Sequence, residues 1–132
     1  MARVHQLHRT ITAMYDDALR PLGLTGGQLN ILVVIAKCGP VSPGNVARRL
    51  NMEKSTISRN IARMHKNGWL TVGAADSGRE QRLTLNAAGS ALLLEARPLW
   101  SRAQTKAKAL VGQGGADSIL RLGDSVRSKM GD

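Results

Sequence analysis

Residues 54–67, KSTISRNIARMHKN, separate by chemistry when they are placed on a helix. At about 3.6 residues per turn, Ile57, Ile61 and Met64 share one apolar face. The opposite face carries a hydroxyl near the start of the helix and cations further along, at positions Ser55, Arg59, Arg63 and Lys66. Hydroxyl and guanidinium groups in this arrangement can bond to base edges and neutralise phosphates. The segment therefore predicts a helix that presents a nucleic-acid-binding face to solvent.

The side chains of this face have different expected roles. Ser55 or Thr56 can reach bases or phosphates, because the N-terminal residues of a helix in the major groove meet base edges. Arg59 can bind O6 and N7 of a guanine bidentately, whereas Arg63 and Lys66 are expected to neutralise phosphates. The alternative is an ordinary amphipathic surface helix with solvated cations. The full set predicted to bind DNA is Ser42, Lys54, Ser55, Thr56, Arg59, Asn60, Arg63, Lys66, Arg79 and Arg82.

A shorter helix is predicted just before this one. Ser42 and Pro43 supply a hydroxyl cap and a proline at the first helical position. A break of about three residues at 51–53 then leads into the second helix, which Gly68 ends. Two helices joined by a tight turn are typical of a helix-turn-helix, and this context favours DNA binding over the solvated-surface alternative.

The predicted start of the second helix lacks a good cap, since Glu53 is a weak capping residue. Its first N–H groups would then be free, and free N–H groups at a helix start form a phosphate site. The alternative is that Ser55 caps a shorter helix.

A hairpin is predicted after Gly68. Residues 69–72 and 81–85 indicate two short strands, and the loop between them, GAADSGRE, is rich in turn-forming residues. Arg79 in the loop and Arg82 on the returning strand suit the minor groove, where negative potential concentrates. Asp76 and Glu80 either dilute this charge or brace Arg79 by ion pairing.

Helices are predicted on both sides of this module. An apolar stripe indicates a first helix from about residue 4 to 22, and Thr25 with Gln28 has the spacing of a capping box for a buried helix over 26–38. Its β-branched run ILVVI leaves a strand as the alternative. Asn86 is expected to cap a long helix that Pro98 kinks or breaks, residues 112–115 interrupt the chain again, and a last helix follows over 116–130. The stripes on the first and last helices need a cover, which predicts dimerisation.

The composition fits a DNA-binding protein. The chain has 132 residues, with 19 Lys and Arg against 9 Asp and Glu, for a net charge of +10. We expect one domain with a polyanionic partner, most often nucleic acid, the alternative being a solvated cationic surface. With only two Trp, one Tyr and no Phe, stacking of single-stranded bases is disfavoured. No apolar run suits a membrane span or a signal peptide, so we expect a cytoplasmic protein without a membrane partner.

Other chemistry finds little support. Cys38 could sense oxidants, but its position favours a buried thiol in a reducing compartment. His5 and His8 could share a metal, although solvated histidines are favoured because no carboxylate or thiol accompanies them. Tyr15 and Trp100 could line a ligand pocket, against core or dimer packing as the alternative. We predict no catalytic residues, no metal and no cofactor, since the histidines and the cysteine are dispersed and no Gly-rich phosphate loop follows a strand.

The chain resembles the MarR family, the multiple-antibiotic-resistance type of winged-helix transcription regulator. The resemblance runs from LRPLGLTGGQLNILVVIAKCGPVSPGNVARRLNMEKSTISRNIARMHKNGWL to the wing ending RLTLNAAG, and the order of elements covers nearly the whole chain. Two details depart from the family pattern. Asp76 lies three residues before Arg79 where the family often has Asp-x-Arg, and Asn86 replaces the usual Thr after Leu85.

The resemblance implies a mainly helical (α+β) winged helix-turn-helix of one domain, residues 1–132. Residues 25–86 would bind DNA, and 1–24 with 87–132 would supply dimerisation helices. A homodimer would place two recognition helices on a pseudo-palindromic operator, usually as a repressor. Many family members release DNA when a small phenolic or lipophilic effector binds. The main alternative is a non-specific architectural DNA-binding protein, followed by a winged helix used for protein contacts.

Overall fold

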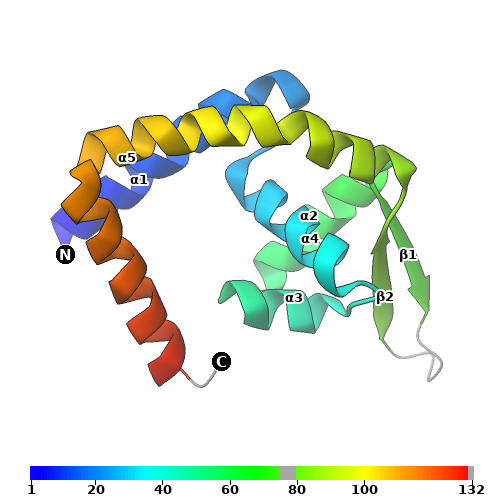
Figure 1. Ribbon diagram of the computed structural model, residues 1–132. Helices are drawn as coiled ribbons and strands as arrows, with labels where there is room; N and C mark the ends of the chain where they lie inside the picture. The colour runs from blue at the N-terminus through cyan, green and yellow to red at the C-terminus, as the bar shows by residue number, and fades with distance from the viewer. Residues whose placement is uncertain (75–79, 131–132) are drawn as a thin grey trace.

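The computed structural model describes residues 1–74 and 80–130. Helix α1 (Ala2–Leu19) continues into a 3₁₀ turn, η1 (Arg20–Leu22), and is followed by α2 (Gly26–Cys38), α3 (Pro43–Leu50) and α4 (Lys54–Lys66). Strands β1 (Leu70–Ala74) and β2 (Gln81–Leu85) form an antiparallel pair before the long helix α5 (Ala87–Lys129) (Figure 1). The predicted fold class, a mainly helical winged helix-turn-helix with flanking N- and C-terminal helices, is confirmed.

The predicted helix starts are confirmed by hydrogen bonds. The Thr25 hydroxyl accepts from the backbone N–H of Gln28 at 3.1 Å, and the Gln28 side chain accepts from the backbone N–H of Thr25 at 3.1 Å, which completes the capping box of α2. The side chain of Ser42 caps α3 by accepting from the backbone N–H of Asn45, and that of Asn86 caps α5 by accepting from the backbone N–H of Gly89. Residues 31–35, for which a strand was the alternative, are helical.

The core surrounds α2. Its apolar residues Ile31, Leu32 and Ile35 are 1% exposed or less. The other helices and both strands add buried residues to the same cluster, which include Leu19, Val46, Ile57, Met64, Leu70, Leu83 and Leu92. Val41 forms an isolated antiparallel bridge with Leu83, which ties the segment before α3 to the returning strand of the wing. The core therefore fixes α4 and the hairpin against one support.

The start of α5 lies directly against the two residues that precede β1. A Cβ atom at position 89 would lie 2.2 Å from the carbonyl oxygen of Trp69, so only glycine fits at Gly89. The Asn86 side chain also donates to the carbonyl of Gly68 at 2.7 Å. These contacts seat the long helix on the base of the hairpin.

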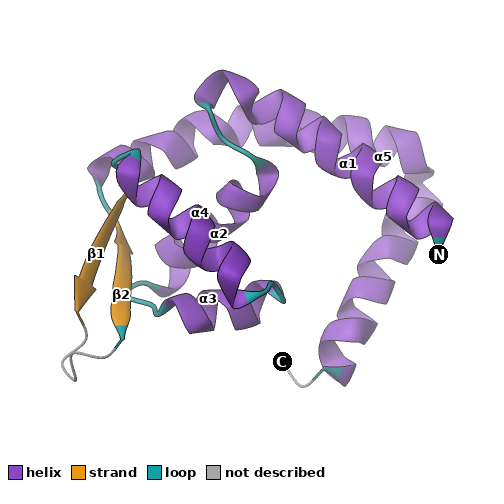
Figure 2. Cartoon of the chain, turned by 180° about the vertical axis from the view of Figure 1, so that it is seen from behind, coloured by secondary structure: helices purple, strands orange, loops and turns teal. Residues whose placement is uncertain are grey.

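Helix α5 begins at the base of the hairpin and runs away from it alongside α1, so the hairpin and the N-terminus lie at opposite ends of the molecule (Figures 1 and 2). The predicted break at Pro98 is wrong, since the backbone dihedrals of α5 are helical there. The non-helical dihedrals within α5 fall at Gly112, with φ 75° and ψ 166°. Pro98 and Leu94, whose carbonyl loses its partner, are both exposed, so water can satisfy that carbonyl, whereas a glycine adopts a positive φ without steric cost. The interruption predicted over residues 112–115 is confirmed at Gly112, and helical structure resumes at residue 113, earlier than the predicted start of the last helix at 116.

Among the described residues no single helix is long and apolar enough to cross a membrane, and the one pair that meets the criterion jointly, residues 2–22 with 26–38, is bent by 74°.

Candidate DNA interface

Helix α4, the second helix of the helix-turn-helix and called the recognition helix below, has the two faces that its sequence predicts. Ile57 and Met64 are fully buried, and Ile61 is 5% exposed. The side chains of Ser55, Arg59, Arg63 and Lys66 are exposed on the other side. Helix α4 packs on α3 and β1 mainly through its apolar face, and Arg59, Arg63 and Lys66 are displayed to solvent.

The turn between α3 and α4 is held by backbone hydrogen bonds. Asn51, at the C-terminal cap of α3, adopts a left-handed conformation with φ 52°. Asparagine tolerates this conformation better than most residues. The N–H of Met52 donates to the carbonyl of Ala47 at 3.0 Å, and that of Asn51 donates to Arg48 at 3.2 Å. The turn thereby sets the angle at which α4 leaves α3.

The N-terminus of α4 lacks a side-chain cap, as predicted. Glu53 occupies the cap position with extended dihedrals and makes no capping hydrogen bond with its side chain. The helix begins at Lys54, so Ser55 lies inside its first turn, and the alternative in which Ser55 caps a shorter helix is wrong. Lys54 and the N–H groups of this turn give the N-terminal end of α4 a positive potential.

The wing pairs β1 and β2 from Leu70 opposite Leu85 to Ala74 opposite Gln81. Leu83 points into the core, and its neighbour Arg82 is exposed opposite Gly73, which has no side chain to cover it. Arg79 and Asp76 lie outside the described residues, so contact between Arg79 and DNA, and its brace by acidic residues, stay predictions.

Two predicted DNA-binding residues are engaged inside the protein. Ser42 is 6% exposed, and its hydroxyl accepts from the N–H of Asn45 at 3.2 Å. Asn60 is half-buried, and its side chain donates to the carbonyl of Thr56 at 3.0 Å and accepts from Gln28 at 3.5 Å. Ser42 therefore caps a helix and Asn60 links α4 to α2, and contact of either residue with DNA stays a prediction. The helical wheel placed Asn60 on α4 but gave no sign of its partner on α2.

A groove of about 740 Å³ lies between α2 and α5. Its walls are mainly apolar, and two cations, Lys37 and Arg97, stand among the lining residues Leu29, Asn30, Val33, Ala36, Lys37, Leu85, Ser90, Leu93, Leu94, Arg97 and Trp100. Trp100 lines this groove, and its contact with a ligand stays a prediction. Tyr15 instead packs against Trp100, with ring centroids 6.3 Å apart, and donates to Gln104 at 3.5 Å. Burial raises the pKa of the Tyr15 hydroxyl above its ordinary value.

The residues considered for redox or metal chemistry are not gathered into a site. Cys38 is half-buried and has no disulfide partner, while His5 and His8 are exposed on the first turns of α1. Within residues 1–74 and 80–130, no three His, Cys, Asp or Glu side chains are close enough together to hold a metal ion.

A helix-turn-helix followed by an antiparallel hairpin defines a winged helix-turn-helix protein. Comparison with known sequences narrows this class. Residues 22–80 match the sequence profile of the MarR family. The crystal structure of the M. tuberculosis transcriptional regulator MosR in complex with DNA is 32% identical, with a TM-score of 0.81 over 96% of this chain and 95% of that one. The chain belongs to the MarR family of transcription regulators.

Two further relatives extend the comparison. An uncharacterised HTH-type transcriptional regulator of Bacillus subtilis, YwoH, is 29% identical over 83 residues, which span 63% of this chain and 61% of YwoH. The fold also matches Bordetella bronchiseptica BpsR, a protein whose DNA binding is regulated by 6-hydroxynicotinic acid. That match has 19% identity and a TM-score of 0.83, and covers 95% of this chain and 91% of BpsR.

Replacement of Arg59 tests whether the exposed face of α4 reads bases. Arg59→Ala should weaken binding to a preferred DNA sequence by about 1–3 kcal/mol and relax the preference at one base pair, because a bidentate contact to guanine is lost. Fluorescence anisotropy with preferred and random duplexes measures both effects. Arg102→Ala is the matched control, since this arginine lies on α5 beside α1. Equal losses on the two duplexes would reassign Arg59 to phosphate contact.

Proposed function

We propose that this chain is a sequence-specific, double-stranded DNA-binding transcription regulator that acts as a homodimeric repressor on a pseudo-palindromic operator. The observation that carries the proposal is the separation of apolar and polar side chains onto opposite faces of α4. Three apolar side chains lock one face into the core, and hydroxyls and cations occupy the free face. A helix held in this way can enter the major groove as a rigid element, with Arg59 toward base edges and Arg63 and Lys66 toward phosphates.

The flanking helices support dimerisation. In the single chain, α5 leaves large apolar side chains exposed beyond its bend, and α1 does so near its start, at Val4, Leu7, Ile119, Leu120, Leu122, Val126 and Met130. Leu122 is 66% exposed and Val126 is 54% exposed. Monomeric proteins rarely expose so many apolar side chains in one region, and a second copy can cover them symmetrically. Residues 1–24 and 87–132 then form the dimer part, and residues 25–86 form the DNA-binding part.

A dimer of this kind fits a two-part DNA site. Two-fold symmetry places one α4 in each of two major grooves about one helical turn apart, so the operator repeats in inverted orientation. Arg79 and Arg82 on the two wings would then lie toward the flanking minor grooves. MosR, which this chain resembles along nearly its whole length, has been crystallised with DNA, and this supports a DNA duplex as the partner.

The groove between α2 and α5 supports a small-molecule effector. Its apolar walls suit an aromatic ring, and Lys37 with Arg97 supplies positive charge for an acidic substituent. BpsR, which responds to the aromatic acid 6-hydroxynicotinic acid, shares the fold. The groove lies between α2, which contacts α4 through Gln28, and α5, which continues into the proposed dimer part. A ligand seated there can therefore change the distance between two recognition helices, and this would release the operator.

Selection of DNA from a random pool tests the proposed function. We expect an enriched sequence with inverted half-sites, bound at least about 10³-fold more tightly than random DNA at physiological salt. Competition anisotropy measures the ratio. Equal affinity for enriched and random duplexes would instead identify a non-specific architectural protein, whose binding rests on charge alone.

A charge placed in the apolar face should separate the two copies. Leu122→Lys is expected to raise the dimer dissociation constant by at least about tenfold, because burial of an unpaired ammonium is strongly unfavourable. Analytical ultracentrifugation over a range of concentrations measures it. Ser128→Lys adds the same charge on the opposite side of the same helix and should leave the dimer intact. Equal behaviour of the two variants would place the interface elsewhere.

Tryptophan fluorescence can follow ligand binding in the groove. In a Trp69→Phe background, Trp100 alone reports, and 6-hydroxynicotinic acid should change its emission saturably. Arg97→Ala should weaken this binding about tenfold through loss of a charge-assisted hydrogen bond, whereas Lys106→Ala, outside the groove, should not. The ligand should also lower operator affinity. No saturable change in emission, or equal affinity in both variants, would remove the groove as the site for this compound.

A further inference from the structure

Gln28 is a buried polar side chain that joins two helices. It is 3% exposed in the first turn of α2, among the apolar residues of the core. Its Oε1 accepts from the backbone N–H of Thr25 at 3.1 Å, and its Nε2 donates to Oδ1 of Asn60 on α4 at 3.5 Å. Among the described residues, every buried side-chain nitrogen and oxygen atom has a partner. A buried amide costs stability unless it is hydrogen-bonded, so Gln28 favours the one position of α4 that supplies an acceptor.

Asn60 carries this constraint into the recognition helix. Its Nδ2 donates to the carbonyl of Thr56 one turn earlier, at 3.0 Å, and this bond fixes the direction of the amide. The oxygen of the same amide then faces Gln28. Arg59 and Ser55 are the sequence neighbours of Asn60 and Thr56 on the exposed side of α4. A shift or rotation of α4 therefore breaks the Gln28 contact and moves the DNA-reading side chains together.

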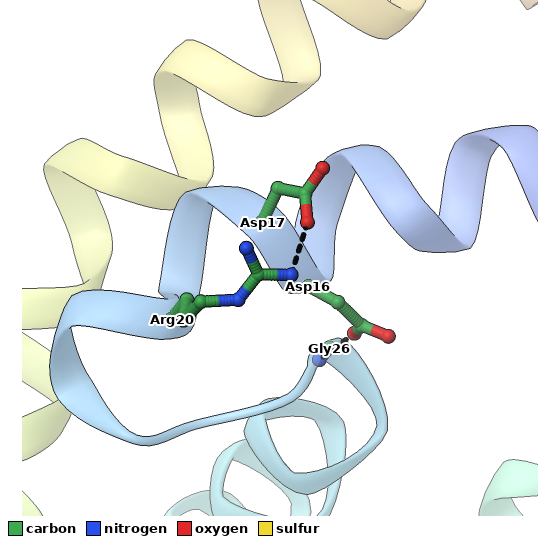
Figure 3. Close-up of polar contacts among 4 residues, drawn as sticks. All are labelled: Asp16, Asp17, Arg20 and Gly26. Atoms are coloured by element: carbon green, nitrogen blue, oxygen red, sulfur yellow. Dashed lines mark hydrogen bonds and ion pairs between the residues drawn. The ribbon is translucent and has the colours of Figure 1, made fainter.

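The other end of the same turn of α2 is tied to α1. Asp16 on α1 accepts from the backbone N–H of Gly26 at 2.7 Å (Figure 3). Gly26 has no room for a larger residue without displacement, since an added Cβ would lie 3.3 Å from the Tyr15 Cβ. The next residue, Asp17, points away from α2 and pairs with Arg20 at 2.5 Å on the surface (Figure 3).

We propose that Gln28 is a positioning residue for DNA recognition and that Asp16, through Gly26, connects its turn to α1, so that a hydrogen-bonded path runs from α1 to the recognition helix. The path runs from Asp16 to the N–H of Gly26, from the backbone N–H of Thr25 to the side chain of Gln28, and then to Asn60 and the carbonyl of Thr56. Networks of buried hydrogen bonds specify one arrangement more sharply than apolar contacts do. The inference rests on the proposed function, because it assigns to these bonds the alignment of α4 on DNA.

Gln28→Met tests the contact with α4 at nearly constant side-chain length. A well-aligned bidentate base contact is worth roughly 5- to 150-fold in discrimination, so partial misalignment should lower the ratio of operator to random-DNA affinity by about tenfold. The control is Thr25→Ala, which removes the hydroxyl of the capping box but leaves the Gln28 amide opposite Asn60. This control should lower the midpoint of thermal unfolding and leave the ratio unchanged. A folded Gln28→Met protein with the wild-type ratio would overturn the proposal.

A double-mutant cycle tests whether Gln28 acts through Asn60. If it does, Asn60→Ala and Gln28→Met each reduce the ratio, and the double variant is no worse than the poorer single variant. Losses that multiply would show independent roles and would overturn the path from Gln28 to α4.

Asp16 provides a test that leaves the core intact. Asp16→Ala should weaken binding to the paired half-sites severalfold but not to a single half-site duplex, because α1 belongs to the dimer part. Asp16→Asn keeps an acceptor oxygen and should restore paired-site affinity, while Asp17→Ala should match the wild type. Equal effects of Asp16→Ala and Asp17→Ala would overturn the role of Asp16. If the wild type itself does not prefer the selected operator, the proposed function fails first, and this inference fails with it.

Discussion

The burial of α2 is the constraint on which the rest of the structure depends. Most of its apolar side chains are buried or half-buried, so neighbouring elements must cover it on several sides, while Asn30, Ala36 and Lys37 remain exposed. Leu19 covers it from α1, Ile57 and Met64 from α4, and Leu83 from the wing. Because each cover must be apolar, the cations of α4 and β2 are left on the outside. The surface that can meet DNA is therefore a consequence of the same packing that stabilises the fold.

Helices α1 and α5, at the two ends of the chain, keep part of their apolar surface exposed. Helices α1 and α5 have apolar stripes like those of α4, but beyond Gly112 there is no core in the same chain to receive them. The positive φ at Gly112 bends α5 sharply, so that its last part leaves the direction of α1 and runs toward the α3 side of the molecule, as Figures 1 and 2 show. The apolar area that one copy cannot bury is the area that a dimer would bury. The position of one glycine thus determines where the second copy would pack.

Much of this could be predicted from local sequence, because caps and helical faces are set within a few residues. Thr25 with Gln28, Ser42 and Asn86 mark their helix starts, and the spacing of Ile57, Ile61 and Met64 orients α4. The rest depended on tertiary contacts. Pro98 was expected to disturb α5, but its exposed position leaves the unpaired carbonyl to water. Asn60 and Gln28 are 32 residues apart in the sequence and lie on different helices. A helical wheel relates only residues of the same helix, so it could not predict this contact.

The groove and the hydrogen-bonded path meet at one turn of α2. Leu29 and Asn30 line the groove, and Gln28, which precedes them, contacts the recognition helix. Arg97 and Trp100 face the same groove from α5, and Tyr15, packed on Trp100, precedes Asp16 in α1. A ligand between α2 and α5 would therefore press on the turn that Asp16 and Gln28 hold from either side. The hydrogen bond between the Gln28 and Asn60 amides is either formed or broken. A small displacement of this turn of α2 would therefore change the alignment of α4. Signal and DNA recognition would then be coupled through the first turn of the most deeply buried helix.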